Sequence, residues 1–420
     1  MKTIPHIALL STMLYIPHFA MANENPLASL LNPDNLPLVH ISEELLVTPY
    51  ILSTDASGMI GGMFLLKKGL LQPQTTTIAT LFYGSSTETT LNSQTRKEHA
   101  KGGAFALLDY ALPTQTPLTL SLWGIKRFLP NATYYINNHS ISSDEEAYTQ
   151  GPGDADSYAL TLKHPFHVET ISGKHTLSLS LFYEHYTFEN IEPDSPHTSN
   201  GLSEWNTQGV RLAYRYDTTN QETLPTQGYR IWCQYSRDFG NGNSLQSWDA
   251  IEGSFTYYQP LLPYTYMEDT TLVYHIQTAY SPSWEYNTPN RDYPAIDAHQ
   301  PPPWEGAHLG GSFRLRGYDQ DRFSAKASLF GAMEYRATLA YNPFASQTIL
   351  PFSIEKFQVV PFVEAGSVAS GYNHNLLNKF AVDGGLGFRA TVAKVPVRLD
   401  VAYSQEGIHA WIMLFDPFRF

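Results

Sequence analysis

Apolar and polar residues alternate with a period of two along most of the chain after Ser57. From Val210 to Asp217, one set of alternate positions is apolar or aromatic, whereas the other carries polar side chains such as Arg211 and Arg215. Successive side chains of a β-strand point to opposite faces of a sheet, whereas a helical period would scatter them around an axis. The pattern therefore predicts strands with one apolar and one polar face.

Sixteen such segments can be counted, with the first centred near residue 62, the next two near residues 79 and 91, and the last near residue 413. Long polar connections, such as 188–206 and 282–327, alternate with mostly shorter ones. An even strand number with short turns at one end and long loops at the other is typical of outer-membrane barrels. The core of a soluble β-sandwich is the alternative, but inward arginines would be costly to bury there. We predict an all-β fold, a transmembrane antiparallel β-barrel of 16 strands.

Composition and charge agree with a chain surrounded by outer-membrane lipids. Charged residues make up 15% of the chain, against roughly 25% in soluble domains, and aromatic residues make up 13%. Beyond the amino-terminal end, no uncharged apolar run approaches the roughly 18 to 20 residues of a membrane helix, and a closed barrel is the other structure that satisfies every backbone group in lipid. The net charge of -13 argues against nucleic acid as a partner, because phosphate binding requires a basic face.

The amino-terminal end is predicted to be an export signal. Lys2 precedes an apolar run and the triplet Ala20-Met21-Ala22, which together have the order of a charged region, an apolar region and a cleavage site. We therefore expect a signal peptide over residues 1–22, a short periplasmic or lumenal segment over 23–56, and the barrel domain over 57–420. The expected location is the bacterial outer membrane.

The carboxyl-terminal stretch is rich in aromatic residues and ends in Phe418, Arg419 and Phe420. Outer-membrane barrels use an aromatic residue at the end of their final strand as an insertion signal, and we predict this role for Phe418 and Phe420. Pro417 cannot donate a hydrogen bond to a strand ladder. The seam between the last and the first strand is therefore expected to be weakly paired.

The long connection 282–327 contains an Arg-Gly-aromatic turn at Arg316, Gly317 and Tyr318. Long connections that are ordered usually carry function. The segments that follow it place charged residues at every second position, so these charges all project to one side of the sheet; they are Glu334, Arg336, Glu364, Asp383, Arg389, Arg398 and Asp400. We expect the loop arginine to meet this charged side.

Five motifs, in the right order, resemble the BamA/TamA superfamily of outer-membrane barrels, also called the bacterial surface antigen family. Leu315-Arg316-Gly317-Tyr318 is similar to its Val-Arg-Gly-Phe/Tyr motif in the sixth surface loop. The other four lie on predicted strands or turns: Asp217 with Pro225 and Gly228, Gly331 to Arg336, Phe362 to Gly366, and Asp383 to Arg389. The resemblance implies a barrel whose sixth extracellular loop folds back into the lumen.

The resemblance also implies a set of contacts that fix this loop. Arg316 is expected to reach Glu364 and to rest near Glu334, because a guanidinium and an inward carboxylate form strong bidentate hydrogen bonds. The predicted lock consists of Arg316, Gly317, Tyr318, Glu334, Arg336, Glu364 and Gly366. The chain departs from the family in two ways: Glu364 stands where the family has Asp, and residues 23–56 are too few for the periplasmic POTRA modules that dock client chains.

The leading hypothesis is that the protein inserts or assembles outer-membrane proteins, or translocates polypeptides, through its lumen or a labile seam. Client β-barrels or secreted polypeptides and a periplasmic partner are the implied partners. The alternatives are a surface antigen or structural barrel without transport and, third, a lumenal lipid hydrolase. The sequence contains no nucleophile elbow, phosphate loop or metal-ligand spacing, so we expect no enzymatic activity, no cofactor and no metal.

Overall fold

The computed structural model describes residues 45–54, 57–91, 94–135, 148–168, 171–188, 204–240, 247–285, 299–302, 304–342, 354–392, 395–414 and 416–418. The predicted export signal lies outside these residues, as do Phe420 and most of the segment 23–56. Among the described residues, no helix is long and apolar enough to cross a membrane.

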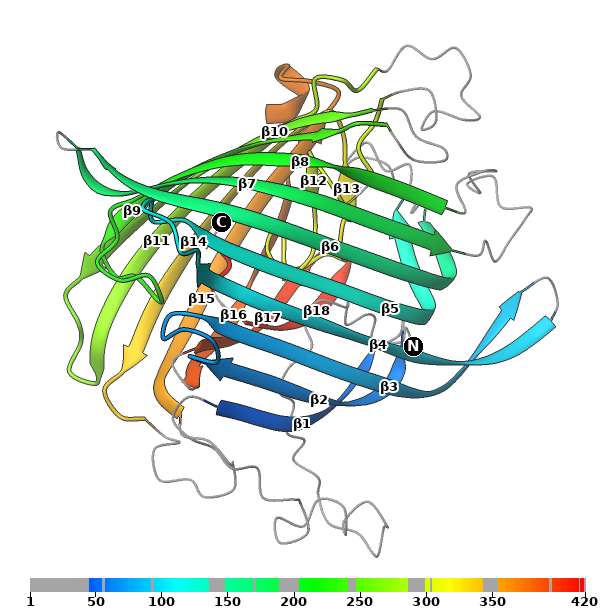
Figure 1. The fold of residues 1–420 in the computed structure, drawn as a ribbon, viewed down its shortest axis with the longest axis horizontal. Coiled ribbons are helices and arrows are strands. Elements are labelled where there is room, and N and C mark those ends of the chain that lie inside the picture. Colours follow the sequence, from blue (N-terminus) through cyan, green and yellow to red (C-terminus); the bar gives the residue numbers. More distant parts are fainter. Residues whose placement is uncertain are drawn as a thin grey trace, which may run out of the picture.

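Sixteen strands form one antiparallel sheet in which each strand pairs with its neighbours in chain order, and the sheet wraps into a barrel (Figure 1). Its strands are β1 (Leu45–Thr54), β2 (Gly58–Lys68), β3 (Thr76–Leu91), β4 (Gln94–Ala111), β5 (Thr119–Tyr135), β6 (Tyr148–Val168), β7 (Ile171–Phe188), β8 (Glu204–Asp217), β9 (Gly228–Asp238), β10 (Asp249–Leu261), β11 (Met267–Tyr280), β14 (Ala327–Leu339), β15 (Ile354–Ala369), β16 (Ala381–Val392), β17 (Val395–Ser404) and β18 (Gly407–Leu414). A short 3-10 helix, η1 (His374–Leu377), lies between β15 and β16. The predicted fold class is confirmed.

The strand count was right although two segments were assigned wrongly. Strand β1 lies at Leu45–Thr54, inside the segment assigned to the periplasm or lumen, so the sheet begins before residue 57. The segments expected near residues 79 and 91 both belong to β3, whose pairing with β4 shifts register between Tyr83 and Ser86. A bulge inserts a residue and inverts the alternation beyond it, so one long strand looks like two in the sequence.

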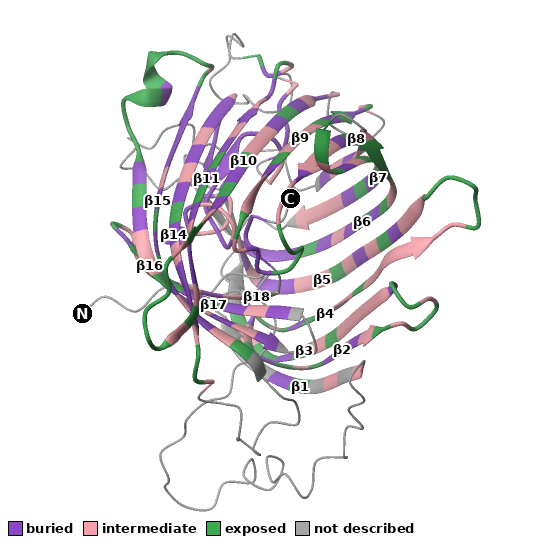
Figure 2. Cartoon of the chain, turned by 90° about the vertical axis from the view of Figure 1, so that its left-hand side faces the viewer, coloured by how far each residue is buried: buried purple, intermediate pink, exposed green. Residues whose placement is uncertain are grey.

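The two faces of the sheet differ as the alternation predicts. Buried and exposed residues alternate along strands such as β6 and β15 (Figure 2). On β7 the outward positions Leu177, Leu179 and Leu181 are exposed, whereas inward Phe182 and Glu184 are buried. The exposed leucines form the lipid-facing surface that a membrane barrel requires.

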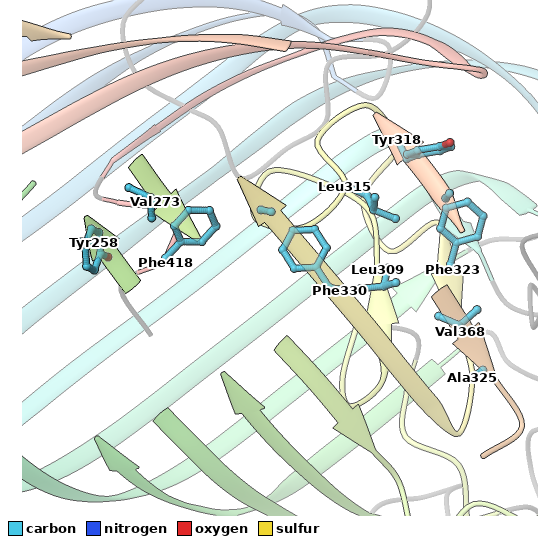
Figure 3. Packing of buried hydrophobic residues seen from close by; sticks show 12 residues of the cluster. Tyr258, Val273, Leu309, Leu315, Tyr318, Phe323, Ala325, Phe330, Val368 and Phe418 are labelled. Carbon is cyan, nitrogen blue, oxygen red and sulfur yellow. The ribbon is translucent and has the colours of Figure 1, made fainter. Parts of the chain in front are cut away.

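The connection between β11 and β14, residues 281–326, is the sixth loop at the long-loop end of the barrel, and we call it loop 6. It contains the strand pair β12 (His308–Leu309) and β13 (Phe323–Ser324), which lies within the ring of barrel strands (Figure 1). Its apolar residues pack against the wall in one buried cluster with Phe330 and Val368 (Figure 3). This apolar cluster is therefore an interface between loop 6 and the wall.

Candidate functional site

The turn that presents Arg316 to the wall has an unusual backbone. Leu315 has φ 53°, a left-handed conformation that is rare for a residue with a branched side chain. Its side chain is fully buried, and a Cβ at Gly366 would lie 3.0 Å from Leu315 Cδ1 and 2.8 Å from Leu309 Cδ1. Strained residues persist only where the surrounding structure holds them. Gly366 therefore belongs to the site because it leaves room for the turn.

Every nitrogen of the Arg316 guanidinium donates to a carboxylate. Nε donates to Glu364 Oε1 at 2.9 Å, Nη1 to Asp400 Oδ2 at 2.9 Å, and Nη2 to Glu334 Oε1 at 2.9 Å. The backbone N–H of Arg316 donates to Glu364 Oε2 at 2.7 Å, and the guanidinium lies 3.5 Å from the centroid of the Phe362 ring. The side chain is fully buried, so these groups replace its hydration shell.

The residues after Arg316 bind the wall through their main chain. Gly317 N–H donates to Asp383 Oδ2 at 2.7 Å, and Ser404 Oγ donates to Gly317 O at 2.5 Å. The hydroxyl of Tyr318 donates to Val382 O at 3.3 Å, and burial raises the pKa of this phenol to about 12. The hydroxyl therefore keeps its proton at neutral pH and remains a donor.

The final strand of the sheet also contacts the turn. Trp411 of β18 donates its indole N–H to Arg316 O at 2.7 Å, and Trp411 is fully buried. Loop 6 is thus bound to five consecutive strands, β14 to β18, through Glu334, Glu364, Asp383, Ser404 and Trp411.

Arginines of the wall neutralise the carboxylates that Arg316 shares. Glu334 accepts from Arg389 Nη2 at 2.8 and 2.7 Å and from Arg336 Nε at 2.9 Å. Arg398 pairs with Asp400 and donates to Ser312 O of loop 6 at 2.7 Å. Removing one partner of a buried pair typically costs about 3–5 kcal/mol, because the other charge is left uncompensated.

Loop 6 has a second contact area on β7 and β8. Trp304 stacks on Tyr186 with ring centroids 4.0 Å apart and donates its indole N–H to Glu184 Oε2 at 2.8 Å. Glu305 accepts from Arg211 Nη2 at 2.5 Å, and the same nitrogen lies 3.1 Å from Glu184 Oε1. The loop therefore spans the lumen between two walls, β7–β8 and β14–β18.

The structure brings all seven residues of the predicted lock together, although Arg336 binds the partner Glu334 rather than the turn itself. Arg336 binds Glu334 and Asp416, whereas Arg316, Gly317, Tyr318, Glu364 and Gly366 form the turn and its seat. Four contributors were not assigned as partners: Asp400, Asp383, Trp411 and Asp416. The first two lay on the inward phase of their segments, so alternation marked them as candidates, but it gave no indication of which carboxylate the arginine would meet.

Phe418 does not lie on the final strand. Strand β18 ends at Leu414, and Phe418 is buried inside the barrel against His275 of β11, with ring centroids 4.3 Å apart. Phe420 lies outside the described residues. Recognition of Phe418 and Phe420 during insertion stays a prediction, but the ring of Phe418 faces the lumen in the folded barrel.

Comparisons with known proteins agree with the barrel. The model of the Omp85 superfamily domain matches residues 130–408. The fold is similar to CdiB from Escherichia coli, with a TM-score of 0.54, 12% identity and coverage of 90% of this chain and 62% of that chain. It is also similar to CdiB from Acinetobacter baumannii, with a TM-score of 0.50, 12% identity and coverage of 89% and 59%.

A further similarity is to BamA from Haemophilus ducreyi lacking POTRA domains 1-3, with a TM-score of 0.49, 12% identity and coverage of 88% of this chain and 69% of that chain. No curated protein sequence matches the chain. The chain spans less than two thirds of the length of either CdiB structure, and at this level of identity the likeness concerns the fold alone.

Proposed function

The chain belongs to the Omp85 superfamily of bacterial outer-membrane β-barrels, and from this premise we propose that it inserts client β-barrel polypeptides into the outer membrane through the seam between β1 and β18. A periplasmic partner would deliver the client. The observation that carries the proposal is the contrast between a filled lumen and a seam at which the described residues form no strand ladder.

The described part of loop 6 that carries Arg316, residues 304–326, occupies the lumen and is held there by buried ion pairs. Arg316 has no exposed surface, and neither do its partners Glu334 and Asp400. A polypeptide that crossed the lumen would have to break these pairs. The geometry therefore favours a route along the wall of the barrel over a route through its centre.

The seam is the weakest part of that wall. Strands β1 and β18 end the sheet order, and no ladder joins them among the described residues. They have 10 and 8 residues, whereas β3 to β7 have between 16 and 21. An unpaired strand edge is a template for pairing with another chain. A client strand can add to this edge by backbone hydrogen bonds.

A disulfide across the seam tests the proposal. Cysteine pairs are placed on β1 and β18 in a Cys233→Ser background, and insertion of a reporter barrel into liposomes is measured before and after oxidation. We expect oxidation to abolish insertion and reduction to restore it. Insertion that continues at full rate with the seam closed would contradict the route and favour a structural barrel without transport.

The control is a disulfide between strands that are already paired. Val401 of β17 and Ala410 of β18 are direct partners in the ladder, so a bond between cysteines at these positions leaves the seam free. We expect this variant to insert the reporter equally well when oxidised and reduced.

A further inference from the structure

The residues that follow β18 turn back into the barrel. After Leu414 the chain leaves the sheet, and Asp416, Pro417 and Phe418 are all buried. The ring of Phe418 lies beside Val273 and near Tyr258, which belong to β11 and β10 (Figure 3). These three residues make no strand ladder, so side-chain contacts hold them in place.

An arginine pair binds the acidic residue of this segment. Asp416 Oδ2 accepts from Arg336 Nη1 at 2.6 Å and lies 3.7 Å from Arg389 Nη1. The other oxygen, Oδ1, accepts the backbone N–H of Phe418 at 2.8 Å. This local bond closes an Asx turn around Pro417, whose fixed φ suits such a turn. The turn sets the distance between the carboxylate and the aromatic ring.

Aromatic and apolar groups bind the other end of the segment. The Phe418 ring stacks on the His275 imidazole with an interplanar angle of 13°, and the guanidinium of Arg336 lies 5.8 Å from the centroid of the Phe418 ring. Thr256 Oγ1 lies 2.8 Å from His275 Nδ1 and orients the imidazole. The site thus has arginines at one end and aromatic and apolar groups at the other, at a fixed spacing. Such a site can bind a short peptide that carries a carboxylate and an aromatic side chain at the matching distance.

We propose that this part of the lumen is a binding site for a polypeptide segment with a carboxylate two residues before an aromatic side chain. Residues 416–418 of the chain fill the site in cis, and a client segment of the same chemistry displaces them. This second part rests on the proposed function, because the client supplies the competing segment. Displacement frees β18, the strand at the seam, from its attachment to β11 and β14.

The site is also connected to loop 6. Arg336 and Arg389, which bind Asp416, both donate to Glu334, and Glu334 accepts from Arg316. When Asp416 has left and no client carboxylate has yet replaced it, Arg336 and Arg389 share fewer carboxylates, and their hydrogen bonds to Glu334 compete with that of Arg316. A coupling of this kind is reciprocal, so release of loop 6 must change the affinity of the site by the same factor.

Tethering of residues 416–418 is expected to keep most free peptides out of the site. A tethered segment has an effective concentration on the order of millimolar, so a free peptide competes poorly against it. When residues 416–418 no longer fill the site, a free peptide binds to it with the intrinsic affinity of the site.

Peptide binding to the purified barrel in detergent tests the site directly. The probe is a fluorescein-labelled Leu-Phe-Asp-Pro-Phe peptide, the sequence of residues 414–418, and the emptied protein is the double variant Asp416→Asn, Phe418→Ala. We expect the emptied protein to bind the probe at least about tenfold more tightly than the unaltered chain does. A Leu-Phe-Asn-Pro-Ala peptide is expected not to bind. Equal affinity of both proteins for the probe, or equal binding of both peptides, would overturn the proposal.

A matched variant separates emptying of the site from a general effect on β18. Ile408→Ala removes an outward, exposed side chain of the same strand and should leave probe affinity as in the unaltered chain. If the double variant fails to fold, a Pro417→Cys variant in a Cys233→Ser background replaces it. Its thiol should react faster with a bulky maleimide when unlabelled probe peptide is added, and an unchanged rate would count against displacement.

The two proposals can fail separately. Binding is measured without a membrane or a client, so a positive binding result with no insertion activity removes the insertase and keeps the site. Insertion through the seam without discrimination between the two peptides removes the site and keeps the insertase.

Discussion

Glu364 binds Arg316 twice, through the guanidinium and through the main chain. Oε1 accepts from Nε at 2.9 Å, and Oε2 accepts from the backbone N–H at 2.7 Å. The carboxylate therefore fixes both the charge of the arginine and the position of the turn that carries it. The superfamily that the sequence motifs resemble has Asp at the position of Glu364, and the longer side chain of Glu364 still reaches both donors.

Replacing Glu364 by Gln should release the turn. An amide offers one acceptor and no charge, so one bond of the turn is lost and the buried guanidinium loses a counter-charge. We expect a loss of about 3–5 kcal/mol in the free energy of unfolding, the usual range for a broken buried pair. The measurement is an unfolding titration with urea, in which heat-modifiable migration in gels gives the folded fraction at each urea concentration.

Glu268→Gln is the matched control for this experiment. Glu268 pairs with Lys356 at 2.8 Å, but the two side chains are 52% and 46% exposed. Exposed pairs contribute about 0–1 kcal/mol. Equal losses in the two variants would show that burial of the Glu364 pair adds nothing.

Arg316→Lys should release loop 6 from the wall nearly as completely as Arg316→Ala does. A lysine ammonium is a point charge, whereas the guanidinium donates in three directions to Glu364, Asp400 and Glu334. We expect both variants to become sensitive to an external protease within residues 304–326, while the unaltered chain resists there. Protection of the Lys variant at the level of the unaltered chain would mean that charge alone holds the loop.

Gly317→Ala should displace the turn although the added group is a single methyl. A Cβ at this position would lie 2.6 Å from Asp383 Cβ and 2.9 Å from Ser404 Cβ. Overpacking of this kind costs about 1–3 kcal/mol, and it also separates Gly317 from its two hydrogen-bond partners. The expected result is a lower unfolding temperature and faster loop cleavage.

The control for Gly317→Ala is Gly331→Ala on β14. A Cβ there would approach only His275 O, at 3.8 Å, which is ordinary contact. The unfolding temperature should therefore stay near that of the unaltered chain. If both variants unfolded at the same temperature, the close packing at Gly317 would not matter to stability.

The sequence predicted the lipid-facing and inward positions because alternation depends only on local backbone geometry. It missed β1 because Leu45–Thr54 is apolar on both phases and contains Pro49, so no alternation marks it. It divided β3 because the register shift after Tyr83 inverts the phase. These errors cancelled in the count, and the alternation placed the remaining strands correctly.

The partners of Arg316 were only partly predictable for a different reason. Glu364 and Glu334 were predicted as partners from a resemblance of motifs. Asp400 lies 84 residues after Arg316 in the sequence, and it reaches Arg316 only because the barrel curves β17 toward loop 6. The inward turn of Asp416 and Phe418 left no periodic signal, because the strand pattern ends at Leu414. Alternation of apolar and polar residues predicts strands, but it does not predict the position of a segment that leaves the sheet.

The attachment of loop 6 to β7 and β8 should weaken as pH rises. Burial raises the pKa of Glu305 to about 8; Arg211 opposes this shift, whereas Glu184 and Glu252 add to it. A released loop would return Glu305 to its ordinary value of 4.5. The attached state therefore binds more protons between these two values, and attachment is strongest below pH 4.5 and declines as pH rises toward 8. Each pH unit in this window weakens attachment by up to about 1.4 kcal/mol.

Protease cleavage of the loop across pH 5 to 9 measures this effect, with a protease whose own activity is corrected at each pH. We expect cleavage within residues 304–326 to increase most between about pH 6 and 8. Glu305→Gln keeps a hydrogen-bonding side chain that does not titrate, so its cleavage should be nearly independent of pH. Glu268→Gln should retain the pH profile of the unaltered chain, because Glu268 lies on the outer surface beside Lys356. A Glu305→Gln variant with the unaltered profile would assign the pH dependence to another group.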